Sequence, residues 1–182
     1  MACWRLPVNR TPRRPYRGAT PANRAVLKTL CLGPGSNIGD REGHLRAAVE
    51  RLAAADLRMV RESPVCETEP LELTAQRWFL NQVVEAETSL FPKQLLARVD
   101  RIERVLGRVR TVPNGPRNID ILSYASAVVR TAELEIPHPR MAARRFVLAP
   151  LADLCPELRH PVTRKTVKEV LEAAPGQAVR RV

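Results

Sequence analysis

The sequence has few aromatic residues, no long apolar run and no closely spaced cysteines. Only 4% of its 182 residues are aromatic, which argues against a protein that stacks nucleic-acid bases on interleaved rings. No uninterrupted apolar stretch approaches the ~18 residues of a membrane-spanning helix, so we expect no membrane contact. The four cysteines include no CxxC pair, which argues against a zinc site and indicates free thiols in a reducing compartment. Since no apolar segment typical of a secretory signal is present either, the expected location is the cytoplasm.

The remaining composition is that of a globular protein with unevenly distributed charge. Hydrophobic residues make up 45% of the chain and charged residues 27%, and this length suits one domain with its own core. The net charge is +11, but six of those charges are arginines in residues 1–25, where no acidic residue occurs. A basic nucleic-acid-binding protein driven by this segment is therefore the weaker alternative, and we do not expect nucleic acid as a partner.

Residues 1–25 form a segment unlike the rest of the chain. They combine arginine with four prolines and show no apolar periodicity, so we expect a disordered basic arm. An organelle transit peptide is an alternative, although the prolines disfavour an amphipathic helix. A start codon assigned too early is the interpretation we favour. The expected organisation is an arm at 1–25, a domain at 26–175 and a tail at 176–182.

Hydrophobic periodicity predicts an α+β fold. Asp40 is suited to cap a helix whose apolar positions follow helical spacing. Gly33-Pro34-Gly35 predicts a tight loop after the first strand. The order of elements suggests a mixed or antiparallel sheet covered by helices. Strands are expected at 26–32, 57–62, 65–68, 79–86, 119–124 and 128–129, and helices after residue 40 and at 92–107, 146–154 and 167–173.

Three arginines and one carboxylate lie close together after the second long helix. Arg108, Arg110, Arg117 and Asp120 fall within fourteen positions of Gly107. Arginine binds phosphate oxygens in a bidentate manner, and a carboxylate can hold Mg²⁺ against those phosphates. The pattern therefore indicates a phosphoryl-type transfer, in which catalysis is mostly positioning and charge neutralisation. Taken one at a time, each arginine is more readily interpreted as a solvated surface charge.

Six short blocks occur in order between about Leu30 and Leu158. They are Gly35-Ser36-Asn37-Ile38-Gly39-Asp40, Phe79-Leu80-Asn81, Gly107-Arg108-Val109-Arg110, Gly115-Pro116-Arg117-Asn118-Ile119-Asp120, Ile136-Pro137-His138-Pro139-Arg140-Met141 and Arg144-Arg145-Phe146-Val147-Leu148. Each block alone is a weak signal, but the six in this order are specific. Together they resemble the 6-hydroxymethyl-7,8-dihydropterin pyrophosphokinase family of folate biosynthesis.

This resemblance implies a reaction, a fold and a set of small-molecule partners. Members of the family transfer the terminal diphosphate of ATP, as one unit, to the hydroxymethyl group of a reduced pterin and release AMP. Their fold is a ferredoxin-like α/β sandwich, and two Mg²⁺ ions held by an Asp-x-Asp pair bridge the phosphates. We accordingly expect a monomeric, ATP-dependent pterin diphosphokinase that uses Mg²⁺, with ATP and the reduced pterin as its partners.

The resemblance assigns seven residues to the nucleotide. Asp120 resembles the first metal-binding aspartate, and Arg108 and Arg117 resemble the catalytic arginines that neutralise the transferring diphosphate. The other expected ATP contacts are Glu103, Arg110, His138 and Arg144. Alternatives are open for two of these residues: His138 could be a structural histidine held between two prolines, and Glu103 an exposed helix charge paired with an arginine.

The resemblance also assigns five residues to the pterin. A flat heteroaromatic ring needs stacking partners and hydrogen-bonding groups at its edge. Phe79 and Phe146 resemble the stacking or wall residues, although either could be plain core, and Asn81 resembles the edge contact. Thr68 and Leu71 match backbone-contact positions. We interpret Gly35-Ser36-Asn37 as a structural turn, because the lysine of a Walker phosphate loop is absent.

The sequence departs from the family pattern at three places. Asp120 is followed by Ile121 and Leu122, so the second aspartate is missing, and position 122 should face the same side as Asp120. Val112-Pro113-Asn114 stands where the family commonly has an Arg-Trp pair, and Glu69 replaces a common proline. These departures motivate an alternative function: a degenerate relative that binds pterin and ATP but turns over poorly.

Overall fold

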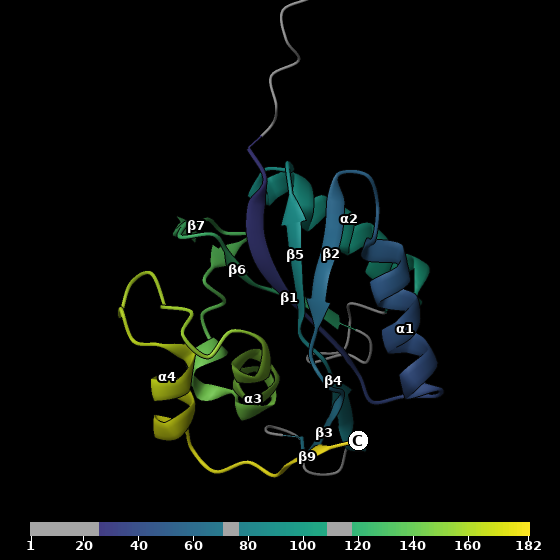
Figure 1. Ribbon diagram of the computed structural model, residues 1–182. Coiled ribbons are helices and arrows are strands. Elements are labelled where there is room, and N and C mark those ends of the chain that lie inside the picture. Colours follow the sequence, from purple (N-terminus) through teal and green to yellow (C-terminus); the bar gives the residue numbers. More distant parts are fainter. Residues whose placement is uncertain (1–25, 71–76, 109–117) are drawn as a thin grey trace, which may run out of the picture.

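The protein is described here by a computed structural model that covers residues 26–70, 77–108 and 118–182. Within these ranges the chain forms a seven-stranded sheet whose pairings are all antiparallel. The central strand β1 has β5 and then β4 along one edge and β6 along the other (Figure 1). The strands of this sheet are β1 (Lys28–Ser36), β2 (Leu57–Glu62), β3 (Cys66–Thr68), β4 (Phe79–Asn81), β5 (Val84–Thr88), β6 (Asn118–Tyr124) and β9 (Val179–Arg181).

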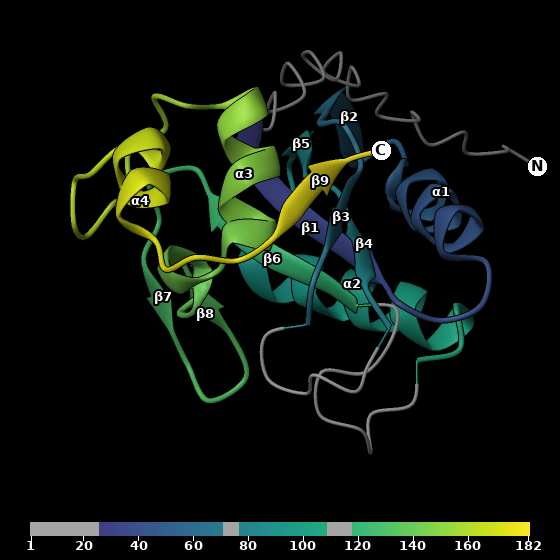
Figure 2. The ribbon, with the colours of Figure 1, turned by 90° about the horizontal axis from the view of Figure 1, so that it is seen from below.

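Helices cover both faces of this sheet, so the molecule has three layers (Figure 2). Helices α1 (Arg41–Leu52) and α2 (Pro92–Val105) lie on one face, and α3 (Arg145–Leu154) and α4 (Val167–Ala173) lie on the other. A short hairpin of β7 (Val129–Arg130) and β8 (Glu135–Ile136) and a 3₁₀ turn, η1 (Met141–Ala143), connect β6 to α3. The predicted α+β class is confirmed, and the ferredoxin-like arrangement is compatible with these layers.

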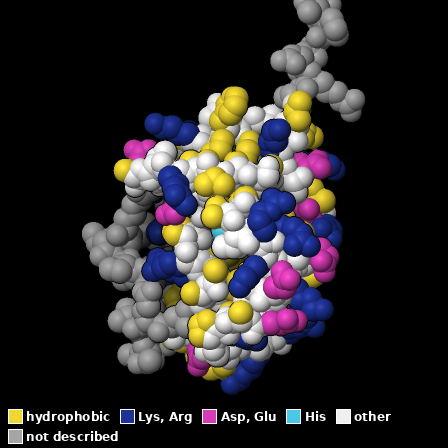
Figure 3. Space-filling model, turned by 90° about the vertical axis from the view of Figure 1, so that its left-hand side faces the viewer, with side chains coloured by type: hydrophobic (Ala, Val, Ile, Leu, Met, Phe, Trp, Pro, Cys, Tyr) yellow, Lys and Arg dark blue, Asp and Glu magenta, His cyan; other side chains and the backbone are white. Residues whose placement is uncertain are grey.

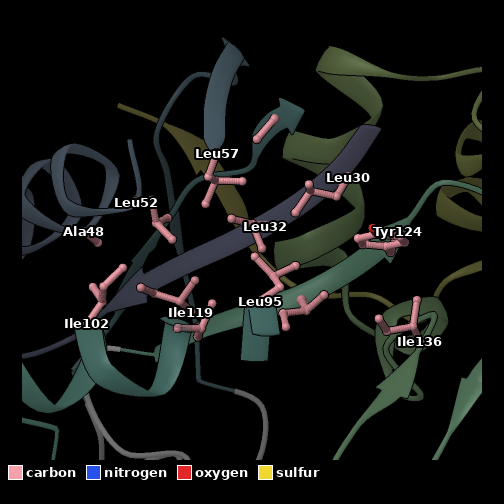
Figure 4. Close-up of a cluster of buried hydrophobic side chains, with 13 residues drawn as sticks. Leu30, Leu32, Ala48, Leu52, Leu57, Leu95, Ile102, Ile119, Tyr124 and Ile136 are labelled. Carbon is pink, nitrogen blue, oxygen red and sulfur yellow. The ribbon is translucent and has the colours of Figure 1, made fainter. Parts of the chain in front are cut away.

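Two hydrophobic clusters hold the layers together. In the first, Leu30 and Leu32 of β1 and Ile119 of β6 pack against Leu95 and Ile102 of α2 (Figure 4). The second lies under α3 and α4 and includes Cys31, Leu122 and Leu148. Neighbouring residues of β1 point to opposite faces of the sheet. Leu30 and Leu32 therefore pack in the first cluster, and Cys31 packs in the second.

The helices begin where the sequence supplies caps. The Asp40 carboxylate accepts a hydrogen bond from the Gly43 N–H at 2.9 Å, which satisfies one of the free donors at the start of α1. At α4, Thr166 and Glu169 form a reciprocal capping box. The predicted cap of α1 is therefore confirmed.

The predicted strand at 79–86 is wrong in one respect, because it is two strands. Residues of β5 pair with the first half of β1, whereas Asn81 of β4 pairs with Gly35 near its end. Between them β1 contains Pro34, which has no N–H to donate to a ladder. The carbonyl of Pro34 still accepts from the Gln82 N–H at 3.1 Å, so the two short strands follow each other along the same edge.

Two further strands were not expected from the sequence. The strand β8 closes the hairpin that follows β6, and β9 pairs with β3 through residues 179–181. Both are two or three residues long, too short for a recognisable alternation of apolar and polar residues. The C-terminal segment thus adds a strand to the edge of the sheet (Figure 2).

The surface carries both signs of charge. Figure 3 looks onto the face of α4 and the β7–β8 hairpin, where basic side chains are spread among acidic and apolar ones. In the part of the chain that the structure describes, none of the helices combines the length and the apolar character needed to cross a bilayer.

Candidate active site

Strands β4 and β6 meet β1 at Gly35, one from each side. Asn81 and Asn118 are both register partners of Gly35, and a Cβ built there would lie 2.6 Å from the Asn81 Oδ1 and 2.9 Å from the Asn118 Oδ1. Only glycine therefore lets both amides approach the strand this closely. Gly33 faces the same side two residues earlier, opposite Asp120. Asn81, Asn118 and Asp120 consequently share one face of the sheet.

This arrangement corrects the expected loop at Gly33-Pro34-Gly35. The strand β1 continues through Ser36 and stays paired with β4 and β6. The two glycines do not make a turn; Gly35 provides room for side chains from the neighbouring strands. A turn follows only at residues 38–40, where Gly39 has a φ of +62°.

Asp120 lies at the centre of a charged cluster. Its Oδ2 is 3.5 Å from Nη1 of Arg144 and 4.0 Å from Nε2 of His138. Arg144, at the start of α3, is only 8% exposed, so its charge is little screened by water. The side chain of Asp120 keeps 20% of its surface exposed and can still reach a ligand. Three residues from separate parts of the chain are thus brought together.

The ring of His138 is set up as a hydrogen-bond donor. Its Nδ1 accepts from the Arg140 N–H at 3.2 Å, which places the ring proton on Nε2, the nitrogen that faces Asp120. Burial lowers the pKa of His138 below its ordinary value, although the nearby Asp120 carboxylate raises it. The imidazole is therefore neutral near pH 7 and presents Nε2–H to the site.

Glu103 accepts a hydrogen bond from the start of β6 and pairs with an arginine that follows α2. Its Oε1 accepts from the Ile119 N–H at 2.7 Å, and its other oxygen pairs with Arg108. The residue is only 2% exposed, and burial raises the pKa of its carboxyl while Arg108 lowers it. The alternative of an exposed helix charge is therefore wrong for Glu103, although its pairing with an arginine is present.

A cavity of about 330 Å³ lies beside Glu103, Asp120 and His138. It opens between α2, the start of β6 and the β7–β8 hairpin, and its lining includes Glu103, Arg108, Asp120 and His138. This volume is within the range of pockets that hold small molecules. The cavity has carboxylate, guanidinium and imidazole groups on its walls, which suits a polar, charged ligand.

A second group of predicted residues lies on β3 and β4. The Asn81 Nδ2–H₂ donates to the Thr68 Oγ1 at 2.8 Å, and both residues are buried. Phe79 is the register partner of Thr68 and is partly exposed. A buried amide that is held by a hydroxyl keeps its carbonyl oxygen in a fixed direction, so the pair forms a rigid polar edge.

Phe146 contacts Arg144 and, through Gln177, is linked to Glu69 at the end of β3. The guanidinium of Arg144 lies over its ring, 5.3 Å from the centroid, at a distance where cation–π attraction operates. The Phe146 N–H donates to the Gln177 Oε1 at 3.1 Å, and the Gln177 Nε2–H₂ donates to the Glu69 carbonyl at 2.8 Å. Phe146 is partly buried, so neither phenylalanine of this group is sealed within the core.

Glu69, which stands where a proline is common in the family that the sequence resembles, is hydrogen-bonded to the C-terminal segment. The Glu69 Oε1 accepts from the Ala178 N–H at 2.8 Å, and the Glu69 N–H donates to the Ala178 carbonyl at 3.3 Å. A proline at position 69 would lack this N–H donor and the carboxylate acceptor. The loop after β3 is therefore tied to the segment that leads into β9.

The structure contains two site residues that the motif comparison missed. Asn118 lies two positions before Asp120 on the same face of β6, a spacing that could have identified it. Gln177 lies 31 residues after Phe146 in the sequence, and no local pattern indicates their contact. The predicted residues Leu71, Arg110 and Arg117, the segment Val112-Pro113-Asn114 and residues 1–25 lie outside the described residues.

The structure places Leu122 where the missing second aspartate was expected to point. Cys31 pairs with Ser123 and Leu32 with Ile121, so Leu122 is the extra residue of a β-bulge. Its side chain is fully buried against Gly33 and in the cluster under α3. This position is part of the core, and it offers no ligand to a metal ion.

Asp120 is thus the carboxylate that the described residues present beside His138 and Arg144. Within the described ranges no group of three or more histidine, cysteine, aspartate or glutamate side chains could hold a metal ion on its own. A metal at this position needs additional oxygen ligands from a substrate and from water. This donor set fits Mg²⁺, which commonly takes one or two carboxylates together with phosphate oxygens.

The chain shares its sequence with a defined group of proteins over most of its length. The family model of 7,8-dihydro-6-hydroxymethylpterin-pyrophosphokinase (HPPK) matches residues 31–156. The chain belongs to the HPPK family. A 2-amino-4-hydroxy-6-hydroxymethyldihydropteridine pyrophosphokinase from Bacillus subtilis is 46% identical over 132 residues, which cover 71% of this chain and 79% of that protein. The corresponding protein of Methylorubrum extorquens is 43% identical over 154 residues, covering 83% and 96%.

Other HPPK relatives are much longer. The folic acid synthesis protein fol1 of Schizosaccharomyces pombe is 38% identical over 156 residues, which cover 84% of this chain and 21% of that protein. The chain therefore spans about a fifth of this relative. A solved Plasmodium falciparum HPPK-DHPS structure superposes with a TM-score of 0.64 at 14% identity, covering 81% of this chain and 43% of that one, and shows the shared fold. The relatives of similar length are named as pyrophosphokinases, which lends no support to the degenerate alternative.

Proposed function

We propose that this chain transfers diphosphate from ATP to the hydroxymethyl group of 6-hydroxymethyl-7,8-dihydropterin and releases AMP, a step of folate biosynthesis. The observation that carries the proposal is the cluster of Asp120, His138 and Arg144 on the same sheet face as the Thr68–Asn81 pair. A charged ligand and a flat polar ring could thus be held side by side. The relatives named as pyrophosphokinases support the same reaction.

The arginines act as fixed positive charges on the transferring group. Arg144 is largely buried beside Asp120, and Arg108 is held by Glu103 at the cavity wall. Arginine stays protonated near neutral pH, so both can neutralise phosphate charge as it develops. On the family resemblance, Arg110 and Arg117 add further phosphate contacts.

Asp120 is the residue that would hold Mg²⁺. When bound, this ion neutralises phosphate charge and orients the reacting oxygens. Asp120 lines the cavity, and Arg144 and His138 flank its Oδ2. The neutral His138 contributes its Nε2–H as a donor to a phosphate oxygen without adding a charge that would compete with the metal.

The pterin is assigned to the opposite half of the site. Asn81 presents an amide whose direction is fixed by the Thr68 hydroxyl, and this amide suits the donor and acceptor pattern of a pyrimidine edge. On the family resemblance, Phe79 and Phe146 supply ring faces for the pterin. On the family resemblance, Leu71 contributes a backbone contact from the loop after β3.

We also propose that the enzyme works as a monomer in the cytoplasm. The cysteines of the described residues, Cys31, Cys66 and Cys155, are free thiols, which fits a reducing cytoplasm. A monomer is sufficient, because the residues assigned to both substrates come from one chain. Its partners are then the small molecules ATP, Mg²⁺ and the reduced pterin.

A turnover assay with the full chain tests the proposed function. AMP release from ATP is measured with and without 6-hydroxymethyl-7,8-dihydropterin, for the wild type and for Asp120→Ala. We expect AMP only when the pterin is present, and a loss of at least about 10²-fold in the variant. Asp153→Asn, which alters an aspartate paired with Arg181 on the surface, serves as the matched control. Pterin-independent AMP release, or full activity of Asp120→Ala, contradicts the proposal.

A further inference from the structure

Two thiols from distant parts of the chain meet at the end of α3. Cys31 lies in the middle of β1, and Cys155 caps the C-terminus of α3. Both side chains belong to the hydrophobic cluster under α3, and a side-chain hydrogen bond couples their ionisation. Cys31 is 2% exposed, whereas Cys155 is partly exposed. One member of the pair is thus reachable from solvent, and the other is buried in the same cluster.

A guanidinium group completes this arrangement. The Arg61 Nη2–H₂ donates to the Cys155 Sγ at 3.4 Å. Strand register places Cys31 opposite Glu85 and Glu85 opposite Arg61, so the three residues form a row across β1, β5 and β2. Glu85 holds Arg61 in place through an Nε–Oε2 contact of 2.5 Å.

The two sulfurs have opposite acid–base properties. The hydrogen bond from Cys31, and then the charge of Arg61, lower the pKa of Cys155 to about 7 against the opposing effects of burial and Glu85. The same hydrogen bond and burial raise the pKa of Cys31. Burial raises the pKa of Cys66 as well. The acidic thiol is therefore the partly exposed one, and its neighbour keeps its proton.

We propose that Cys155 is a modification site: a thiolate that hydroperoxides oxidise and that Cys31 then resolves into an intramolecular disulfide. The geometry supplies the three parts that such a site needs. They are an accessible sulfur, a cation beside it, and a second thiol in the same packed cluster.

The chemistry balances with one hydroperoxide as the oxidant. The Cys155 thiolate attacks one peroxide oxygen, the O–O bond breaks, and the sulfur becomes a sulfenic acid as hydroxide leaves and takes up a proton. The Cys31 sulfur then attacks the Cys155 sulfur. The S–S bond forms, the S–O bond breaks, and the departing hydroxide takes the Cys31 proton as water. With hydrogen peroxide the sum is two thiols and one peroxide giving one disulfide and two waters.

The proposed site lies apart from the substrate residues. Arg144 and Phe146 are at the N-terminal end of α3, and Cys155 follows its other end. A helix of ten residues is about 15 Å long. A disulfide would therefore tie the far end of α3 to the central strand without entering the cavity at Asp120.

Alkylation of the full chain tests the reactivity of Cys155. Reduced protein is treated with iodoacetamide from pH 5.5 to 9.5, and the modified cysteines are identified by peptide mass spectrometry. At pH 7 a thiol with a pKa of 7 is half ionised, compared with roughly 3% for an ordinary thiol. We expect a midpoint near 7 for Cys155 and alkylation at least about tenfold faster than at Cys66, the buried internal control.

Two substitutions separate the contributions of Arg61 and Cys31 to the low pKa of Cys155. Arg61→Gln and Cys31→Ala are both expected to raise the midpoint of Cys155, with the larger shift in Cys31→Ala because its hydrogen bond contributes most. Arg58→Gln is the matched control, since it removes a similar strand-to-strand ion pair, with Glu87, that does not reach Cys155. Arg61→Gln changes an exposed residue, so this comparison stands even if Cys31→Ala does not fold.

Peroxide treatment tests the second step. A slight molar excess of hydrogen peroxide is expected to lower the intact mass by two hydrogens and to link the peptides that contain Cys31 and Cys155. Cys31→Ser should block the link and leave a dimedone-reactive Cys155. The proposal is overturned if Cys155 is alkylated no faster than Cys66, if its midpoint stays above 8.5, or if peroxide links other cysteines instead.

Discussion

The two halves of the candidate site are held in different ways. On the nucleotide side, charged groups position one another: Arg144 flanks Asp120, and Glu103 pairs with Arg108. On the pterin side, neutral groups are positioned by hydrogen bonds, including those of Gln177 to Phe146 and to the Glu69 carbonyl. The difference follows the expected ligands, because a triphosphate needs fixed charge and a flat ring needs a fixed shape.

This contrast predicts that substitutions on the two sides change different kinetic parameters. Loss of a charge on the nucleotide side should lower the rate of the chemical step, because charge neutralisation is greatest in the transition state. Loss of a neutral hydrogen bond on the pterin side should mainly weaken substrate binding.

The largest effect is expected for Arg144→Ala. It removes a buried cation beside Asp120, and kcat should fall about 10²–10³-fold. Single-turnover measurement of AMP formation at saturating substrates reads this step directly. The neighbouring Arg145→Ala is the control, because the side chain of Arg145 donates to the Leu171 carbonyl of α4 and not to Asp120. Equal losses in both variants would refute a specific role for Arg144.

Glu103→Gln should have the next largest effect, on stability as well as activity. The amide can still accept from Ile119, but the buried charge that pairs with Arg108 is lost. We expect the free energy of unfolding to decrease by about 2 kcal/mol. Urea denaturation measures this change, with the exposed Glu42→Gln as control. An unchanged denaturation midpoint would show that the pair does not stabilise the fold.

Gln177→Ala tests the pterin side. Loss of its two hydrogen bonds, to Phe146 and to the Glu69 carbonyl, should raise KM for the pterin about tenfold, at roughly 1 kcal/mol or slightly more for the pair. The affinity for a non-hydrolysable ATP analogue should not change. Gln82→Ala, which loses bonds to Glu62 and Ser63, is the control. A loss of ATP affinity equal to that of pterin would erase the proposed division between the halves.

The smallest effect is a pH dependence of stability from His138. Burial lowers its pKa in the folded state, so below the ordinary value of about 6.5 the unfolded state binds more protons. The stability that neutral His138 contributes is complete above that pH and is lost as the pH falls below it through the lower pKa of the folded state. We expect the difference in unfolding free energy between wild type and His138→Gln to shrink from pH 8 to pH 5.5. A constant difference would contradict the prediction.

Sequence alone predicted those features that short-range patterns encode. The cap at Asp40 and the apolar spacing of α2 depend on neighbours within one or two turns, and both elements formed as expected. Asp120, His138 and Arg144 were found through the order of motif blocks, and the structure brings them together.

Features that depend on distant partners were not predictable in this way. The break between β4 and β5 reflects Pro34 of the facing strand, and β9 forms only because β3 offers an edge. Gln177 enters the site from a segment with no motif of its own. Leu122 was correctly expected to face the side of Asp120, but its burial in the core depends on α3, which lies more than twenty residues later.

The close packing around Gly35 limits which substitutions the protein can tolerate. An added methyl there would press on the oxygens of Asn81 and Asn118 together, so one conservative exchange would displace a residue assigned to the pterin and a neighbour of Asp120 on β6. At Gly33 the same methyl meets only the branched end of Leu122, at 3.3 Å, where a small rotation relieves the contact. In a saturation library selected for growth without external folate, position 35 should admit glycine alone, whereas alanine should survive at position 33.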